Sequence, residues 1–179
     1  MPEKNTHDTT LPLFFFGSLM DQDVLEIVLG RSIDIQHFKQ GVLLGYQCER
    51  EAKESYPVLI PSPGKQADVL IAETLSSDDI DRILFYETGE YDFVRFTLQK
   101  NGQEIAALGF ATGEGIASSG QKWHLNIWQK KDKAVFLPLA KRFMEAYGKM
   151  TLPEALRLWD ELVLEYDQDR TETGSSLAC

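Results

Sequence analysis

Short apolar runs separated by turn residues fill the first two thirds of the chain. Each run is only a few residues long and is rich in aromatic or β-branched residues, as strands are. The runs are residues 11–16, 41–46, 56–60, 67–74, 93–98 and 103–111. Two connections contain turn signals: Pro-Ser-Pro-Gly at 61–64, and Asn101-Gly102, the strongest local signal for a hairpin. The pattern predicts an α+β fold with short helices, in which a mixed, mostly antiparallel sheet curls into a small β-barrel.

The apolar period changes to that of helices in the last third. Apolar residues between Leu137 and Tyr147 recur at helical spacing, and Pro138 is expected near the start of that helix or at a kink. A second apolar stripe follows residues 151–154, Thr-Leu-Pro-Glu, which have the capping-box pattern. Because few residues join these helices, we expect an antiparallel pair. The predicted divisions are a flexible N-terminus (1–10), a barrel domain (11–130), a C-terminal helical pair packed on the barrel (131–168) and a disordered tail (169–179).

The charge balance excludes two classes of partner. Acidic residues number 28 and basic residues 18, so the net charge of -10 opposes binding to nucleic acid or to an anionic membrane surface. No apolar run approaches the roughly 18 residues of a membrane span, and the first ten residues lack the pattern of a signal peptide. Cys48 and Cys179 have no metal-ligand spacing and are expected to be reduced thiols. We therefore expect a cytoplasmic protein with no membrane partner.

A helix predicted from about residue 77 brings one carboxylate to its inward face. Ser76 or Ser77 can cap this helix, and the three aspartates that follow favour the positive end of the helix dipole. Glu87 stands seven, four and three residues after the inward-facing Ile80, Ile83 and Leu84. A partly desolvated carboxylate there would have a raised pKa and would be a better general base near neutral pH. Alternatively, the helix ends one residue early and Glu87 faces solvent or caps a neighbouring loop.

The first apolar run breaks at Gly17-Ser18. Such a break before a helix can direct successive backbone N–H groups towards one point, where they bind a carboxylate or phosphate. Gly17 permits a positive φ or a close approach, and Ser18 adds a hydroxyl. Gly-Ser is equally an ordinary turn sequence, so both interpretations stay open. A short helix is expected next, with Asp21 as its N-cap and Gly30 as its end.

The remaining polar and aromatic residues have simpler interpretations. The three histidines have no cysteine or carboxylate neighbours at ligand spacing, so neither a metal nor a cofactor is expected. Trp123 and Trp128 either wall a pocket or hold the C-terminal helices on the barrel. Lys130, Lys131 and Lys133 form a basic run that is most simply a solvated loop.

Four segments in register resemble one known family. They are FFFGSLMDQDVLEIVLGR, GVLLGYQCER, YPVLIPSPG and ETLSSDDIDRILFYETGEYDFVRFTL, which together extend from about Leu13 to Ala111. In this order they resemble the γ-glutamylcyclotransferase-like superfamily, and in particular its avirulence-induced-protein branch. That branch typically has F-x-Y-G-[TS]-L near the start, a Tyr-Pro before a Pro-Gly turn, and F/Y-E-G-x-x-Y before a late hairpin.

The resemblance implies a small mixed barrel with a pocket at one end. In active members, the loop equivalent to Phe16, Gly17, Ser18 and Leu19 holds the α-carboxylate of a γ-glutamyl group, and the acid that matches Glu87 is the catalytic base. The implied reaction closes the γ-glutamyl group into 5-oxoproline and releases an amine, without a metal or cofactor. The implied partner is a small-molecule γ-glutamyl substrate, and the sequence contains no signal for an oligomeric state.

Three positions near these motifs need comment. Phe16 stands where tyrosine is commonest, so a pocket hydrogen bond is either lost or supplied elsewhere. Thr88 takes the usual glycine position, and Gly89 follows it. Tyr91 matches the family's later tyrosine, with contact to substrate and structural packing as its two interpretations.

Two other functions stay open beside the enzyme. One is a non-catalytic module that binds a small carboxylate on the same fold, which the Phe16 substitution favours. The other is a stress-related interaction protein that uses its C-terminal helices, with Leu158 and Leu164 off the main apolar stripe as contacts.

Overall fold

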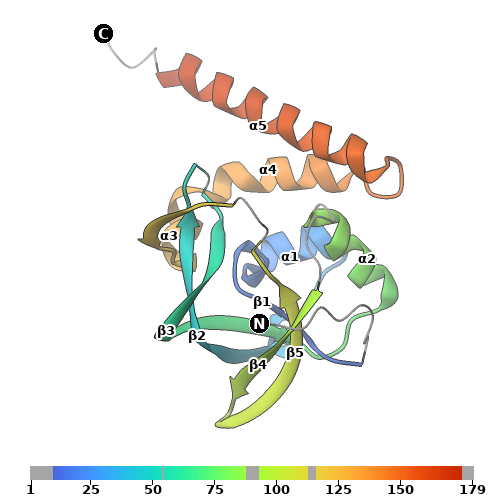
Figure 1. Cartoon of the computed structure of the whole chain (residues 1–179). Helices are drawn as coiled ribbons and strands as arrows, with labels where there is room; N and C mark the ends of the chain where they lie inside the picture. Colours follow the sequence, from blue (N-terminus) through green and yellow to red (C-terminus); the bar gives the residue numbers. More distant parts are fainter. Residues whose placement is uncertain (1–9, 54, 88–92, 113–115, 175–179) are drawn as a thin grey trace.

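Pairing of β2 with strands on both of its sides closes a barrel. The computed structural model describes residues 10–53, 55–87, 93–112 and 116–174. Within them the sheet order is β3-β1-β5-β4-β2-β6, and an additional β3–β2 pairing closes the first five of these strands (Figure 1). The strands are β1 (Leu13–Phe15), β2 (Lys39–Glu51), β3 (Pro57–Ala72), β4 (Phe93–Lys100), β5 (Gln103–Phe110) and β6 (Ser118–Lys122). Since a closed sheet has fewer free edges, closure removes sites for pairing with other chains.

The sheet is mixed because one pairing is parallel. β1 runs parallel to β5, with Leu13 opposite Leu108, whereas its pairing with β3 is antiparallel. The other described pairings are also antiparallel. Asn101 and Gly102 join β4 to β5 with φ values of 50° and 76°, as a two-residue type I′ hairpin requires. The predicted α+β class and the mixed, mostly antiparallel barrel are therefore confirmed.

The turn predicted at 61–64 does not end a strand. β3 continues from Pro57 to Ala72, and β2 pairs with it on both sides of this segment. The register shifts between Leu44, opposite Gln66, and Tyr46, opposite Pro61, so the Pro-Ser-Pro-Gly residues form an irregularity within one long strand. Proline lacks the N–H for a regular ladder, which explains the local break in register without loss of the strand.

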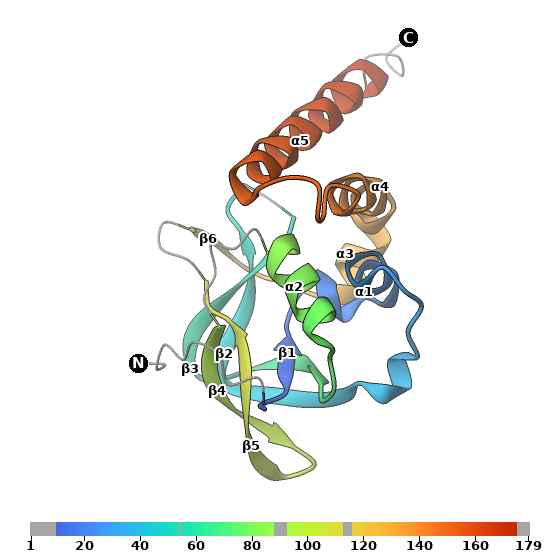
Figure 2. The ribbon, with the colours of Figure 1, turned by 90° about the vertical axis from the view of Figure 1, so that its right-hand side faces the viewer.

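Helices cover the barrel on one side. They are the 3₁₀ turns η1 (Ser18–Met20) and η2 (Ile35–His37), and the helices α1 (Gln22–Leu29), α2 (Ser77–Tyr86), α3 (Leu125–Lys131), α4 (Lys133–Met144) and α5 (Leu152–Gly174). α1 and α2 lie between the barrel and the two C-terminal helices, and α5 packs against α4 and extends away from the barrel (Figures 1 and 2). None of the helices described is both long and apolar enough to cross a membrane. The apolar core is shared by strands and helices, with Phe14, Leu25, Ile71, Ile83, Trp128 and Phe143 among its buried members.

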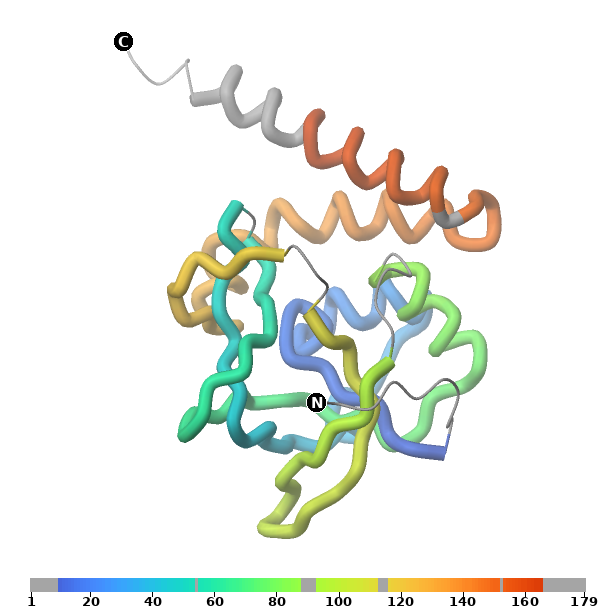
Figure 3. The backbone as a smooth tube through the Cα atoms, in the orientation of Figure 1, coloured from blue at the N-terminus to red at the C-terminus, as the bar shows by residue number. Residues whose placement is uncertain are grey.

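The C-terminal helices pack as the predicted antiparallel pair, with differences at their ends (Figure 3). α4 begins at Lys133, so Pro138 lies well inside it, and α3 precedes it unpredicted. Residues 169–174 belong to the tail that was expected to be disordered, and their backbone continues α5 to Gly174, whereas residues 175–179 lie outside the described residues. A formed helix extends with one hydrogen bond per added residue, and residues 154–173 contain neither Gly nor Pro to stop it.

Asp21 links the start of α1 to the C-terminal helices. One carboxylate oxygen caps α1 by accepting the N–H groups of Asp23 and Val24, at 3.0 and 3.3 Å. The other accepts from Gln129 Nε2 at 2.7 Å and from Lys133 Nζ at 2.8 Å. Burial opposes ionisation of Asp21, but these hydrogen bonds leave its pKa below the usual value. The predicted N-cap is therefore confirmed, and Lys133 is paired with Asp21 and Asp23 rather than lying in a solvated loop.

Replacement of Asp21 by alanine should destabilise the fold. The change removes the cap and leaves Lys133 without its buried partner, so we expect the free energy of unfolding to fall by about 2–4 kcal/mol. Urea denaturation at pH 7 measures this. Asp23→Ala is the matched control, because Asp23 is exposed and contacts the same Lys133. An equal loss from both variants would contradict a special role for the buried carboxylate.

Candidate active site

Polar contacts with α1 fix the start of α2. Ser76 and Asp79 form a capping box. The Ser76 hydroxyl accepts a hydrogen bond from the Asp79 backbone N–H, and the Asp79 carboxylate accepts one from the Ser76 backbone N–H. Arg31, just after α1, donates to both carboxylate oxygens of Asp79, at 3.1 and 2.9 Å. Arg82 Nε donates to the carbonyl of Val28 at 2.7 Å. Because paired guanidinium–carboxylate hydrogen bonds set both distance and orientation, α2 is held in register with α1.

Aromatic contacts with α4 and the turn after it fix the end of α2. The Phe85 ring stacks on Phe143, with ring centroids 5.0 Å apart, and packs edge-on against Tyr147 at 5.5 Å. The Arg82 guanidinium lies 4.7 Å from the centre of the Tyr147 ring. These contacts hold Phe85, which directly precedes Tyr86 and Glu87, two residues that line a pocket.

Glu87 is the C-cap of α2 and lines a pocket. Its N–H donates to the carbonyl of Ile83 at 2.9 Å, so α2 ends at Tyr86. The side chain does not turn away to solvent: Glu87 is half-buried, and its exposed part faces the pocket. Burial raises the pKa of Glu87 to about 7. No described side chain donates a hydrogen bond or an ion pair to this carboxyl, so nothing offsets the desolvation.

Gly17, Ser18 and Leu19 line the same pocket. The backbone N–H groups of these three residues donate to no acceptor among the described residues, whereas Met20 N–H already bonds to the Gly17 carbonyl. Gly17 has a φ of -139°, so a positive φ is not the reason for glycine here. Instead, a Cβ on Gly17 would lie 2.7 Å from Pro57 Cγ. The close approach to β3 is what requires glycine.

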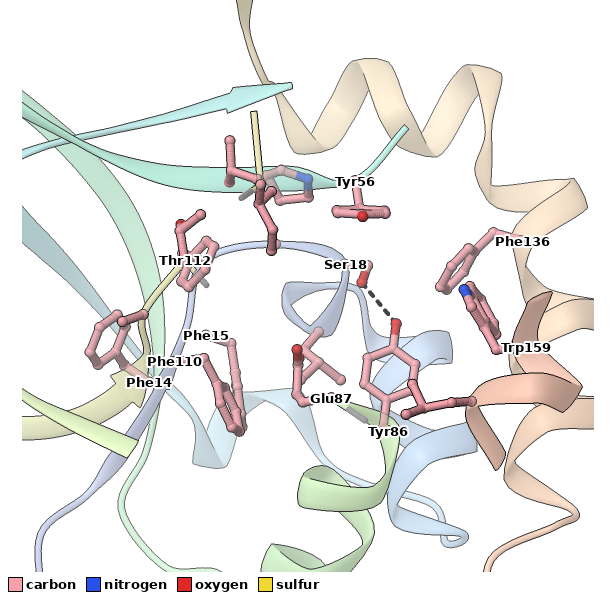
Figure 4. A pocket seen from close by; sticks show the side chains of 18 residues that line it. Phe14, Phe15, Ser18, Tyr56, Tyr86, Glu87, Phe110, Thr112, Phe136 and Trp159 are labelled. Carbon is pink, nitrogen blue, oxygen red and sulfur yellow. Dashed lines mark hydrogen bonds between the residues drawn. The ribbon is translucent and has the colours of Figure 1, made fainter. Parts of the chain in front are cut away.

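A hydrogen bond joins the two parts of the site. Ser18 Oγ and Tyr86 Oη are 3.0 Å apart, as the dashed line in Figure 4 shows. Burial first, and the adjacent Glu87 charge second, raise the pKa of Tyr86, so its hydroxyl stays protonated. Tyr86 was not among the predicted site residues. Phe16 was the available signal, since a phenylalanine there means that a pocket hydrogen bond is either lost or supplied from another position.

The pocket has a volume of about 340 Å³ and a mostly apolar wall. Phe16 lines it with the predicted Gly17, Ser18, Leu19 and Glu87, whereas Tyr91 lies outside the described residues. In Figure 4, Phe136 and Trp159 lie on one side of the Ser18–Tyr86 bond, and Phe14, Phe15 and Phe110 lie on the other. The lining residues that the sequence analysis did not assign to a site are Phe14, Phe15, Tyr56, Pro57, Val58, Tyr86, Phe110, Ala111, Thr112, Ile116, Phe136, Leu156 and Trp159.

The two tryptophans singled out from the sequence are structural. Neither lines the pocket just described. The Trp123 indole N–H donates to the Ser55 carbonyl at 2.9 Å, and Trp128 packs edge-on against Phe136 with centroids 5.4 Å apart. They therefore hold α3 and α4 on the barrel, which is the second of the two predicted interpretations.

Neither a metal site nor a reactive thiol is evident in the described part of the chain. No three side chains of His, Cys, Asp or Glu in that part are placed to hold a metal ion together. Cys48 is buried and unpaired, and its thiol donates to the Phe16 carbonyl at 3.4 Å. Burial raises the pKa of Cys48 to about 12, so it packs as a small apolar residue.

Comparison with known proteins identifies relatives of the whole domain. A family model described as "Gamma-glutamyl cyclotransferase, AIG2-like" matches residues 13–129. AIG2-like protein A of Arabidopsis thaliana is 24% identical over 140 residues, which cover 76% of this chain and 83% of that protein. AIG2-like protein C of the same plant is 24% identical over 168 residues, which cover 92% and 94% of the two chains.

Solved structures show the same fold. The solution structure of one Arabidopsis thaliana protein matches with a TM-score of 0.52 at 22% identity, over 81% of this chain and 98% of that one. A second solution structure from this plant matches with a TM-score of 0.54 at 16% identity, over 82% of this chain and 88% of that one. At these identities the match shows a shared barrel and helical cover, and no more.

The raised pKa of Glu87 predicts a pH-dependent effect of Glu87→Gln on stability. Between pH 4.5 and about 7 the native carboxyl is protonated and the unfolded one is not, so the stability of the native chain falls as pH rises through this window. Glutamine stays neutral throughout. The full pKa shift corresponds to at most about 3 kcal/mol of stability, and exposure of the carboxyl to the pocket reduces this value. The free energy of unfolding of the variant, relative to that of the native chain, should therefore be about 1–2 kcal/mol higher at pH 8 than at pH 4.5. Denaturation at both pH values measures the difference, and a pH-independent difference would contradict the prediction.

The close approach at Gly17 predicts a rescue experiment. Gly17→Ala should lower the free energy of unfolding by about 1–3 kcal/mol, because the added methyl overlaps Pro57. Pro57→Ala removes the overlapping ring carbons. The loss in the free energy of unfolding of the double variant should therefore be smaller than the sum of the losses of the two single variants. Chemical denaturation of all four chains tests this, and strict additivity would mean that Pro57 is not the obstacle.

Proposed function

Because the chain belongs to the AIG2-like γ-glutamyl cyclotransferase family, we propose that it cyclises the γ-glutamyl group of a γ-glutamyl amine or peptide to 5-oxoproline. One observation supports this above all: the pocket combines a carboxyl whose pKa is about 7 with three successive N–H groups that have no described acceptor. A γ-glutamyl group has an α-ammonium and an α-carboxylate on one carbon. The ammonium fits Glu87, and the carboxylate fits Gly17, Ser18 and Leu19.

In the proposed mechanism Glu87 acts as general base and then as general acid. It takes a proton from the α-ammonium, which frees the nitrogen lone pair. This nitrogen attacks the γ-carbonyl carbon and forms a tetrahedral intermediate. Glu87 then gives the proton to the departing amine, the C–N bond to that amine breaks, and the ring nitrogen loses its second proton to the Glu87 carboxylate, which passes it to solvent. The products are 5-oxoproline and a free amine, and no water is consumed. A pKa near 7 suits both steps, because the group exists in both protonation states at neutral pH.

The rest of the pocket orients the substrate. Nucleophile and electrophile belong to one molecule, so the principal task is to hold the chain in the conformation that closes a five-membered ring. The N–H groups at 17–19 would fix the α-carboxylate. Tyr86 would take over the part that a tyrosine at position 16 plays in relatives, since its hydroxyl bonds to Ser18 in the same pocket.

Phe16 also favours a second candidate, a module that binds a small carboxylate without turnover. Phe16 lines the pocket and offers no hydroxyl. Such a module would bind 5-oxoproline or a γ-glutamyl compound with an affinity unaffected by Glu87→Gln, and would release no product. Calorimetry combined with product analysis separates it from the enzyme.

Glu87→Gln should abolish most turnover. General acid–base catalysis typically contributes 10²–10⁴-fold, so we expect kcat/KM for 5-oxoproline release to fall by about that factor. For the native chain, kcat/KM should decline below an inflection near pH 7 as Glu87 becomes protonated. Assays of purified protein with a panel of γ-glutamyl amines and dipeptides test both points.

Glu104→Gln provides the control for this assay, because Glu104 is exposed on β5 and does not line the pocket. This variant should keep full activity. No 5-oxoproline from any member of the panel, or unchanged release by Glu87→Gln, would overturn the proposed function.

A further inference from the structure

A second pocket lies where the ends of β2 and β6 meet α3. Its volume is about 180 Å³, and none of its lining residues lines the Glu87 pocket. Figure 1 shows α3 beside the β2–β3 pair, on the side of the molecule opposite α2, which ends at Glu87. We call this second pocket the cation pocket, because Arg50, Lys122, His124 and Lys131 are among its lining residues.

The lining of the cation pocket reverses the sign of the charge on the whole chain. Three of its described residues, Arg50, Lys122 and Lys131, are cationic, and one, Asp132, is acidic, which leaves an excess of two positive charges. The imidazole of His124 adds a further hydrogen-bond donor. The net charge of the chain is -10. Because charges of one sign that gather in a hollow focus the electrostatic potential there, this pocket attracts an anion.

The two lysines of the cation pocket have no partner in the described part of the chain. No hydrogen bond or ion pair between described residues involves the side chain of Lys122 or of Lys131. Glu49 lies opposite Lys122 in the pairing of β2 with β6, but its carboxylate accepts hydrogen bonds from Gln47 and Ser118. Both ammonium groups can therefore turn to a ligand without breaking an interaction of the fold.

Tryptophans give the cation pocket a firm wall. The backbone N–H of Trp123 donates to the Cys48 carbonyl, and its indole N–H donates to the Ser55 carbonyl, both at 2.9 Å. The Trp123 and Trp128 rings pack with centroids 6.3 Å apart. Ile127 also lines the pocket and is 47% exposed, so an apolar surface lies beside the cations. The lining thus offers both charge and apolar contact.

We propose that the cation pocket binds a phosphomonoester of a small organic molecule. The two charges of the phosphate match the excess of two cations, and lysine binds phosphate as a point charge. The organic part packs against Ile127. A volume of about 180 Å³ corresponds to roughly six water molecules of ~30 Å³ each, which suits a ligand of this size. The proposal does not depend on the function proposed for the Glu87 pocket.

Calorimetric titration of the full chain with three probes tests the chemistry of the ligand. Phenyl phosphate and phenyl sulfate have the same shape, but at about pH 8 the phosphate, whose second pKa is about 6, carries one more charge. We expect phenyl phosphate to bind at least about tenfold more tightly. Inorganic phosphate, which has no ring, should bind about three- to tenfold more weakly than phenyl phosphate. Equal affinity for phenyl phosphate and phenyl sulfate, or no binding of phenyl phosphate at about 10 mM, would overturn the proposal.

Neighbouring lysines provide matched variants. Lys122→Gln and Lys131→Gln should each lower the affinity for phenyl phosphate by about 5–10-fold. Lys130→Gln is the control, because Lys130 is exposed on the same helix as Lys131 and does not line the cation pocket. It should change the affinity by less than about twofold. All three side chains are exposed, so the variants should fold, and urea denaturation checks this. An equal loss from Lys130→Gln would show general attraction to the surface and would contradict a site.

The same variants distinguish other places and sources of phosphate. Phosphate held by the N–H groups of Gly17, Ser18 and Leu19 would bind Lys131→Gln as tightly as the native chain, and that result would rule out the cation pocket. Sedimentation with vesicles that contain phosphatidic acid tests a lipid headgroup. We expect no retention of the chain, because its net charge of -10 opposes docking on an anionic surface. Retention that Lys131→Gln abolishes, without binding of phenyl phosphate, would assign the pocket to a lipid and overturn the proposed ligand.

Discussion

Burial of the Glu87 carboxyl without a cationic partner is the constraint on which the site depends. A carboxylate in water has little tendency to hold a proton at neutral pH, and one paired with arginine has even less. Here the pocket desolvates the group and supplies no described charge partner, so its pKa rises to about 7. This desolvation therefore bears directly on the proposed proton transfer.

The scaffold keeps that carboxyl in place from several directions. The pair between Arg31 and Asp79 holds the start of α2 against α1, and the stacking of Phe85 on Phe143 holds its end against α4. The Ser18–Tyr86 hydrogen bond then ties the end of α2 to the break after β1. Because these contacts come from separate parts of the chain, the two halves of the site keep their spacing through the packed fold.

The C-terminal helices complete the pocket as well as the core. Asp21 at the start of α1 pairs with Lys133 at the start of α4, so the segment after η1 and the helical pair share a buried junction. α4 and α5 in turn place Phe136 and Trp159 at the pocket. The helices therefore form part of the wall of the pocket, although the matched family segment ends before them.

The sequence by itself determined the features that local physics controls. Asp21 and Ser76 as caps, the Asn101-Gly102 hairpin and Glu87 on the inward stripe follow from neighbours within a few residues. Tertiary structure decided what depends on distant partners. β3 stays one strand because β2 pairs on both sides of its prolines, and Tyr86 meets Ser18 across 68 residues. Trp159 has the same apolar pattern whether it faces a core or a pocket, so only packing could assign it. The sequence pattern indicates which residues become buried, whereas the tertiary structure decides which residues they contact.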